Sequence, residues 1–441
     1  MISPLRTLLL LFYTVCICLV IMVMSPGELI ILDQKTGFDV FTLDDFGSNR
    51  GKNEPEADLS FLDELQSEVD SLEERPPLAA KDSSLVENDS TPAVGTAELA
   101  EGLKEARQPI ESKDGNRNHL DKFFASLSGL SKEANRVRII HYGDSQIEGD
   151  RISGYLRERL QRRFGGCGVG MVPFKLRDNL RFTMRFESSE EWTKFGYIDS
   201  EEKPTTNQLG TLASYFKFTP EKDSAFVSKA RYANVTFTDS PLGYKRNSEV
   251  EHLRMFFRNP HGELQTEINF NNKIITTQTL PISKDLSVFE YKFPNKSDFR
   301  SVKVRVASSG SPELYGFSMD CNTGIALDNV PIRGSSGVEF SKMDKATIKK
   351  LFQELDVKLI IVEFGVNVVP GMSESYSWYE NQYYRQLRYF KSIVPDVDIL
   401  VIGLSDMSRL RKGRYESYPN VAPIRNAQKR AAFKAGCAFW D

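Results

Sequence analysis

The sequence predicts an α/β protein whose parallel sheet is interrupted by an all-β domain, and three observations support this prediction. A buried strand, a polar turn and a helix follow one another between residues 136 and 164. Segments that alternate apolar and polar residues then fill 172–320. After residue 340, near-continuous apolar strands alternate with helices. Continuous apolar strands are typical of parallel sheets covered on both faces, whereas alternation is typical of antiparallel sheets.

Composition limits the classes of function. The chain has 441 residues, of which 40% are hydrophobic and 27% charged, and this predicts a globular protein with more than one domain. A net charge of −3 provides no electrostatic footprint for nucleic acid, so we expect a small-molecule, carbohydrate or protein partner. The five cysteines form no CxxC pair or Cys/His cluster, which predicts no metal or cofactor site. Whether Cys167 and Cys321 pair is left open.

The N-terminus predicts a membrane anchor. Residues 7–24, "TLLLLFYTVCICLVIMVM", are uncharged and follow Arg6, and about 20 such residues span a bilayer as a helix. The end of this segment, "VIMVMSPGE", lacks a small-x-small cleavage pattern. This favours an uncleaved signal anchor that comprises residues 1–24, and disfavours a cleaved signal peptide. Arg6 then places the remainder outside the cytoplasm, facing the periplasm or cell envelope. Residues 25–118, largely acidic and poor in aromatics, are expected to be a disordered linker.

The α/β domain is expected over 119–171 and 321–441, around a β-sandwich or jelly roll at 172–320. Periodicity predicts a helix at 151–164 with its apolar face on Ile152, Tyr155, Leu156 and Leu160. The other expected elements are helices at 119–130, 345–355, 376–394 and 421–436, and strands at 136–143, 357–365, 398–406 and 437–441.

The stretch "IIHYGDSQIEG" (139–149) carries the first candidate site. Ligands of parallel α/β sheets bind beyond the carboxyl ends of the strands, which is where Gly143, Asp144 and Ser145 are expected. They also precede a helix N-terminus, whose N–H groups favour negative charge. Ser145 could attack an ester carbonyl while its own N–H stabilises the oxyanion. The alternative is that Ser145 or Asp144 simply caps the helix.

Three stretches together resemble a known family. "GDSQIEGDRISGYLRERLQRRFGGCGVGMVPF" resembles the first block of the SGNH, or GDSL-like, hydrolases. It looks closest to bacterial peptidoglycan and polysaccharide O-acetylesterases, which carry a β-sandwich inserted soon after this block. "VPIRGSSGVEF" (330–340) is similar to the second block, with Gly337 the better match and Gly334 the lesser. "VEFGVNVV" (362–369) is similar to the third block, with Asn367 at its key position. The resemblance covers about 119–441.

The resemblance implies a flavodoxin-like three-layer α/β fold and an esterase that removes O-acyl, chiefly O-acetyl, groups from a polysaccharide or peptidoglycan. It assigns Ser145 as nucleophile and gives the oxyanion to the N–H groups of Ser145 and Gly337 and the side-chain amide of Asn367. Gly143 and Asp144 would order the turn. Taken singly, the glycines could instead be loop residues chosen for positive φ, and Asn367 a turn former.

The general base of this family, a His in a D-x-x-H motif near the C-terminal end of the domain, has no match here. The sequence contains only His119, His141, His252 and His261, all before Asn367. An extended strand would place His141 about 13 Å from Ser145, so we expect no direct contact. We expect His252 and His261 to be surface or loop residues. No general base is therefore found in this chain.

Two explanations of the missing base remain. Either the D-x-x-H segment has been lost by truncation or is supplied by a separate polypeptide, or the protein is a non-catalytic relative that binds an acylated glycan. The final "CAFWD" (437–441) would start a strand whose edge is poorly covered, which favours a missing segment. A glycan-binding scaffold could use Trp192, Tyr197, Phe216 and Phe218 to stack on sugars, although a role in the core is favoured. An O-acyltransferase, in which a sugar hydroxyl captures the acyl-serine, is a further alternative.

Overall fold

A computed structural model describes residues 28–31, 34–39, 108–113, 115, 117–130, 135–178, 180–219 and 230–441. The chain divides into two units, 1–93 and 94–441. In the first unit, strands β1 (Glu28–Ile31) and β2 (Gln34–Asp39) form an antiparallel hairpin. The predicted anchor lies outside the described residues, and among the helices that are described none has the length and apolar character needed to cross a membrane.

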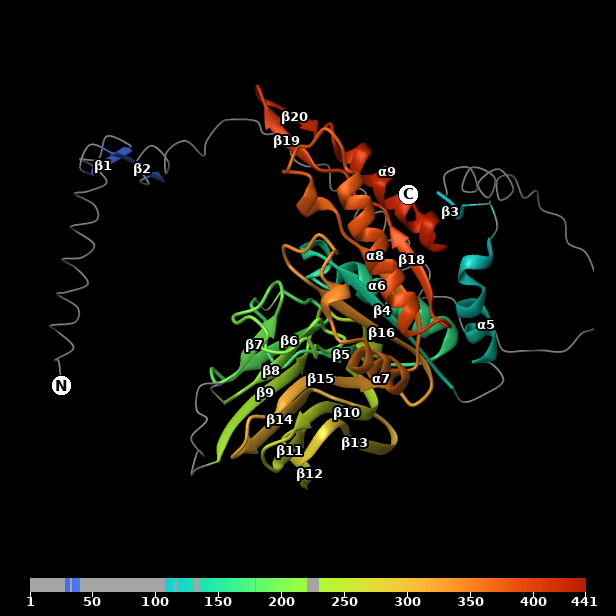
Figure 1. The fold of residues 1–441 in the computed structure, drawn as a ribbon. Coiled ribbons are helices and arrows are strands. Elements are labelled where there is room, and N and C mark those ends of the chain that lie inside the picture. Colours follow the sequence, from blue (N-terminus) through green and yellow to red (C-terminus); the bar gives the residue numbers. More distant parts are fainter. Residues whose placement is uncertain are drawn as a thin grey trace, which may run out of the picture. The chain divides into compact units, whose positions relative to one another are not determined.

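The second unit contains a six-stranded sheet that confirms the predicted α/β fold (Figure 1). Its first five strands are parallel, and β3 is antiparallel to β21. Numbered along the chain, the parallel strands have the flavodoxin-like order 2-1-3-4-5. In spatial order the strands are β16 (Gly324–Pro331), β4 (Arg136–Gly143), β17 (Val357–Glu363), β18 (Asp398–Ile402), β21 (Ala438–Trp440) and β3 (Ile110–Glu111).

Helices cover both faces of this sheet, which makes three layers (Figure 1). On one face, α5 and α6 pack against Val137, Ile139 and Leu359, and on the other α7, α8 and α9 pack against Ile140 and Ile360. Strand residues alternate between the two cores because successive side chains of a strand point to opposite faces. The helices are η1 (Arg117–Leu120), α5 (Asp121–Gly129), α6 (Arg151–Phe164), α7 (Lys345–Leu355), α8 (Ser377–Ile393) and α9 (Val421–Ala435).

Two expectations about the ends of the domain are corrected. Strand β3 and the β1–β2 hairpin lie within 25–118, so the prediction of a disordered linker does not hold for these strands. Strand β21 is also not an uncovered edge, because β18 pairs with one side of it and β3 with the other. The argument for a missing segment that rested on a bare edge is therefore removed. The cause is β3, a two-residue strand without a recognisable sequence pattern.

The predicted apolar face of α6 is partly wrong. Ile152 and Tyr155 are exposed, at 40% and 50%, although Leu156 and Leu160 do pack against the core. The fully buried face is polar instead, and its members recur every four residues: Ser153, Arg157 and Gln161. Each of them hydrogen-bonds to a group of the sheet or of its loops, which is what allows a polar side chain to be buried.

The insertion is an antiparallel β-sandwich, as predicted (Figure 1). Phe237 of one sheet stacks on Phe317 of the other, with ring centroids 5.6 Å apart. The first sheet has the order β13 (Ser283–Asp298), β10 (Glu249–Asn259), β15 (Glu313–Asp320), β8 (Ser214–Lys217) and β7 (Thr193–Gly196), with β5 (Gly170–Val172) also on β15. The second has the order β12 (Lys273–Leu280), β11 (Leu264–Phe270), β14 (Ser301–Ser308), β9 (Arg231–Asp239) and β6 (Met184–Ser188).

The junction between sandwich and parallel sheet is closed by covalent and ionic bonds. A disulfide joins Cys167 to Cys321, so the pairing that the sequence left open is present. Arg138 of β4 is fully buried and bonds to the carboxylates of Asp320 and Asp328. Although burial alone would raise it, the guanidinium of Arg138 holds the pKa of Asp320 at about 2. Both crossings between the two domains are thereby fixed.

Candidate active site

The carboxyl ends of four parallel strands meet at one edge of the sheet. Gly143 at the end of β4 is in register with Pro331 of β16 and with Glu363 of β17. Glu363 is in turn in register with Ile402 of β18. The N–H of Ile332 donates to the Gly143 carbonyl at 2.8 Å, which fixes the exit of the first loop against the second. All loops that carry the predicted site residues therefore leave from the same edge.

The turn at Ser145 is a short 3₁₀ helix, η2 (Ser145–Ile147), that presents an exposed serine. Its cap is Asp144, whose Oδ1 accepts the Gln146 N–H at 2.9 Å. Gly143 has no room for a side chain, because a Cβ there would lie 2.8 Å from Ile147 Cδ1 and 3.0 Å from the Glu363 carbonyl oxygen. The capping alternative thus applies to Asp144, and Ser145 is left facing solvent.

The loop after β16 contacts the Ser145 turn through an ion pair. Both Nε and Nη2 of Arg333 reach the Glu148 carboxylate, at 3.0 and 2.9 Å. Glu148 belongs to the turn itself, since its N–H donates to the Ser145 carbonyl at 3.2 Å. Asp178 holds Arg333 from a second side at 2.7 Å. A bidentate arginine–carboxylate pair has a fixed geometry, so it orients one loop relative to the other.

The same loop contacts Asn367 on its other side. Asn367 lies in η5 (Val366–Val368), is exposed, and donates from Nδ2 to the Ser335 carbonyl at 2.8 Å. The Gly337 N–H, assigned to the oxyanion from sequence, instead donates to Ser335 Oγ at 2.9 Å. Gly337 is buried, and a Cβ there would lie 2.7 Å from the Phe364 ring. Gly334, the lesser match, is exposed with open space around it and φ of +78°.

The structure therefore gathers the sequence-predicted residues around one loop. Residues 332–337 contact the Ser145 turn through Arg333 and contact Asn367 through Ser335. The side chain of Gln146 adds a link to the loop after β18, donating to Ser405 Oγ at 2.7 Å. Three polar loops at a single sheet edge form the candidate active site.

A buried polar network beneath the turn was missed by sequence reasoning. His141 is fully buried in β4, with Nε2 at 2.9 Å from Glu363 Oε2 and Nδ1 at 2.9 Å from Ser153 Oγ. Ser153 also donates to Asn329 Oδ1 at 2.9 Å, and Asn329 Nδ2 donates to the Ile147 carbonyl at 2.9 Å. The network thus reaches the last residue of η2. The four-residue spacing of polar residues along α6 is the signal that could have revealed it.

Asp144 has an unusual electrostatic environment. Burial, together with the nearby Glu363 carboxylate, raises the pKa of Asp144 to about 6, against the effect of the hydrogen bond from Gln146. Oδ2 of Asp144 is buried with no hydrogen-bond partner among the described residues. Its carboxyl group therefore changes charge near neutral pH, directly next to the exposed serine.

None of the four histidines, all of which lie within the described residues, hydrogen-bonds to Ser145. His119 lies in η1, and His141 has both ring nitrogens occupied by Glu363 and Ser153. His261 is exposed in the turn after β10, as expected. The expectation for His252 is wrong, because this residue is buried in β10. Burial and the neighbouring guanidinium groups lower the pKa of His252 to about 3.

The aromatic residues suggested for sugar stacking belong to the sandwich core. Trp192 and Phe216 are completely buried, and Phe218 is 3% exposed. Trp192 stacks on Phe174 with ring centroids 4.8 Å apart. Tyr197 is partly buried, and its hydroxyl donates to the Lys342 carbonyl at 3.1 Å. A glycan surface built from these four rings is not supported.

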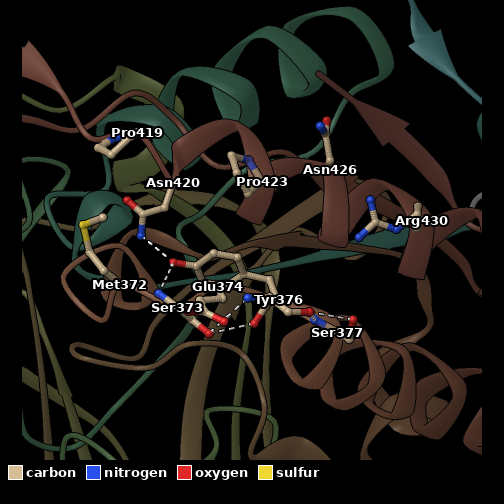
Figure 2. Close-up of a pocket in the computed structure, with 11 residues that line it drawn as sticks. Met372, Ser373, Glu374, Tyr376, Ser377, Pro419, Asn420, Pro423, Asn426 and Arg430 are labelled. Atoms are coloured by element: carbon tan, nitrogen blue, oxygen red, sulfur yellow. Dashed lines mark hydrogen bonds between the residues drawn. The ribbon is translucent and has the colours of Figure 1, made fainter.

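A polar pocket of about 360 Å³ lies beside the segment that follows Asn367 (Figure 2). It is formed by residues 372–377, at the start of α8, and by the first turns of α9. Asn420 joins the two sides, donating from Nδ2 to the Tyr376 hydroxyl at 2.7 Å and to the Val369 carbonyl at 2.8 Å. The volume is within the range of about 300–1,000 Å³ that is typical of ligand sites. Neither Ser145 nor Asn367 lines this pocket.

Comparisons with known proteins agree with this architecture. No family model matches the chain, and no curated protein matches it in sequence. A solved peptidoglycan O-acetylesterase is 16% identical, with 75% of this chain and 85% of that chain covered at a TM-score of 0.55. At this identity the likeness shows a shared fold. A family two carbohydrate esterase from Clostridium thermocellum (7% identity, 46% and 77% coverage) has a TM-score of only 0.20 and adds no argument.

Proposed function

We propose that this protein is a serine esterase of the SGNH type that removes O-acyl groups, chiefly O-acetyl, from a polysaccharide or peptidoglycan. The observation that carries the proposal is the exposed Ser145 at the end of β4, on the edge where a single loop contacts both its turn and Asn367. The fold shared with a peptidoglycan O-acetylesterase supports the proposal, as does the position of the site at the carboxyl ends of parallel strands.

In the proposed reaction, Ser145 Oγ attacks the ester carbonyl and gives its proton to a base. The resulting oxyanion is stabilised by the N–H of Ser145 and by the free N–H of the Asn367 amide. For the third donor we propose the N–H of Gly334 in place of that of Gly337, because the Gly337 N–H is already bonded to Ser335. The sugar hydroxyl leaves with a proton, and water then hydrolyses the acyl-serine.

None of the four histidines is placed to act as the general base for Ser145. A serine hydroxyl without an adjacent base is a weak nucleophile. We therefore expect slow turnover of a small ester by the full-length chain, and acceleration by added imidazole acting as a diffusible base. The alternative of a non-catalytic glycan-binding relative, which this lack of a base favours, predicts glycan binding without turnover.

The test is hydrolysis of an aryl acetate and of O-acetylated peptidoglycan, with and without imidazole. In Ser145→Ala we expect the imidazole-dependent rate to fall to that of buffer with imidazole alone. Ser128→Ala, which replaces an exposed serine of α5, is the matched control and should leave the rate unchanged. Imidazole-dependent turnover that survives in Ser145→Ala would exclude the assignment.

An envelope location is proposed on separate grounds. The Cys167–Cys321 disulfide is of the kind that persists in oxidising compartments and is rare in the cytosol. It supports the placement predicted from Arg6 and residues 7–24. Alkylation of free thiols in unreduced and reduced protein from intact cells tests it. Recovery of both cysteines as free thiols would contradict it.

A further inference from the structure

A small hairpin projects from the sheet edge that carries the candidate active site. Strands β19 (Ser408–Arg411) and β20 (Arg414–Ser417) form a sheet of their own, which extends beyond α8 and α9 (Figure 1). Lys412 and Gly413 form its two-residue turn with positive φ of 50° and 78°, as the tight turns of hairpins require. An isolated two-stranded hairpin is marginally stable in water because it has no hydrophobic core of its own.

The base of the hairpin is attached to the active-site loops. Ser417 Oγ donates to Asp406 at 2.8 Å, and the Tyr418 N–H donates to the Met407 carbonyl at 2.9 Å. One residue before Asp406, Ser405 Oγ accepts the hydrogen bond from Gln146, the neighbour of Ser145. A ligand that contacts the hairpin is therefore held by the same segment that contacts the Ser145 turn.

The register divides the hairpin into an apolar face and a cationic face. Leu410 is paired with Tyr415, so their side chains share one face, and they are 65% and 78% exposed. Arg411 is paired with Arg414 on the opposite face. Cross-strand pairs lie close enough to interact, and like charges directly opposite each other are unfavourable. An anion placed between these two arginines would relieve that repulsion.

The charge of the hairpin is opposite to that of the whole chain. Residues 408–417 contain three arginines and one lysine against a single glutamate, whereas the complete chain carries a formal net charge of −3. That glutamate, Glu416, lies 3.9 Å from Arg411. In the described part of the chain, no carboxylate lies within 4.0 Å of Arg414 or Lys412. Lys412 and Arg414 are thus available to an external ligand, and Arg411 has only a long, solvent-exposed pair with Glu416 to exchange for one.

We propose that the β19–β20 hairpin binds the acidic groups of an anionic polysaccharide whose acyl ester reaches Ser145. The inference rests on the proposed function and narrows its substrate class from any acylated glycan to one with repeated negative charge. Arg411, Lys412 and Arg414 contact the acidic groups, and Leu410 with Tyr415 packs on the apolar faces of sugar rings. Pro419, which lines the polar pocket of Figure 2, lies two residues after the end of the hairpin along the chain.

The test measures binding of the full-length Ser145→Ala protein in neutral detergent, so that its outcome does not depend on turnover. The probes are insoluble peptidoglycan, which carries carboxylates, and cellulose, which is neutral. Exposed ion pairs are individually weak, so Arg411→Gln/Arg414→Gln should lower the affinity for peptidoglycan about threefold to tenfold. The difference should shrink at high salt, and cellulose binding should not change.

Lys273→Gln/Lys284→Gln removes the same charge from exposed positions of the sandwich and should leave peptidoglycan binding intact. Unchanged binding in the arginine variant, or an equal loss in the lysine control, would overturn the proposal. Hairpin-dependent binding to phosphatidylserine vesicles with no effect on peptidoglycan would also overturn it, in favour of a lipid surface. If the arginine variant loses peptidoglycan binding but the wild-type protein shows no ester turnover, the proposal that the hairpin binds an anionic glycan stands and the proposed esterase activity is excluded.

Discussion

Polar groups are used differently at the two ends of strand β4. Near its start, Arg138 is buried and both carboxylates that face it are paired with it, so the junction is closed to any ligand. Near its end, Ser145 is exposed, as is Asn367 after the neighbouring strand β17, and the buried groups beneath the Ser145 turn bond to it. The first arrangement stabilises the attachment of the sandwich, and the second leaves reactive groups free. Charge density alone therefore does not distinguish the candidate active site from the junction.

The largest expected effect is on the stability of the junction. Arg138→Met removes the guanidinium shared by two buried carboxylates and leaves Asp320 only the more distant Arg254, at 3.6 Å, so we expect the free energy of unfolding to fall by about 3–5 kcal/mol. Arg151→Met, at an exposed position of α6, should change it by less than about 0.5 kcal/mol. Urea denaturation measures both. A loss below about 1 kcal/mol for Arg138→Met would show that the junction does not depend on this network.

The next effect is on turnover and is confined to the sheet edge. Asn367→Ala removes one proposed oxyanion donor, so we expect the imidazole-dependent rate to fall by about 10²–10³-fold. The free energy of unfolding should fall by only about 0.5–1.5 kcal/mol, because the exposed side chain loses one hydrogen bond, to the Ser335 carbonyl. Asn426→Ala, an exposed asparagine of the neighbouring pocket, is the control. Equal rates for these two variants would remove Asn367 from the mechanism.

A smaller effect is expected from the network beneath the turn. The Ser153 hydroxyl hydrogen-bonds to both His141 Nδ1 and Asn329 Oδ1, and Ser153→Ala removes both bonds. We therefore expect the free energy of unfolding to fall by about 1–3 kcal/mol. Because Asn329 also bonds to the Ile147 carbonyl, the rate should fall as well, while Ser153→Thr, which keeps the hydroxyl, should restore part of it. A stability loss without any change in rate would make the network purely structural.

The last effect depends on pH. The pKa of Asp144 is raised to about 6 in the folded protein, against about 3.9 when unfolded, so the folded state binds more protons between these values. Its contribution to stability is therefore lost as pH rises from about 4 to 6. Asp144→Asn keeps an oxygen for the Gln146 N–H, so this variant should gain stability over wild type above pH 6 and lose that gain towards pH 4. Melting temperatures between pH 4.5 and 7.5 test this, and a constant difference would contradict it.

The sequence predicted the regular elements well where local periodicity decides them. The helix at 151–164, the helix at 345–355 and the strand at 136–143 have the predicted bounds. The burial of α6 could not be predicted from apolar residues, because Ser153, Arg157 and Gln161 are buried through hydrogen bonds to distant strands. Those partners are defined only by the tertiary fold.

Prediction of the site shows the same limit. The family resemblance singled out Ser145 and Asn367, and each of them follows a strand whose carboxyl end the sheet topology brings to the same edge. The preference for Gly337 over Gly334 came from the family resemblance, and the sequence could not show that Ser335 Oγ accepts the N–H of Gly337. Similarly, nothing in the letters around His252 indicates that Arg254 and the packing of β10 keep its ring buried and uncharged.

The cystine between residues 167 and 321 has a mechanical consequence. Its two α-carbons are 5.0 Å apart although 154 positions separate them along the chain. The disulfide closes residues 167–321 into a covalent loop that contains the sandwich and that begins and ends at the α/β domain. A pulling force applied to the α/β domain would therefore pass through the disulfide and bypass this loop. The sandwich could then unfold and refold without lengthening the part of the chain that bears the force.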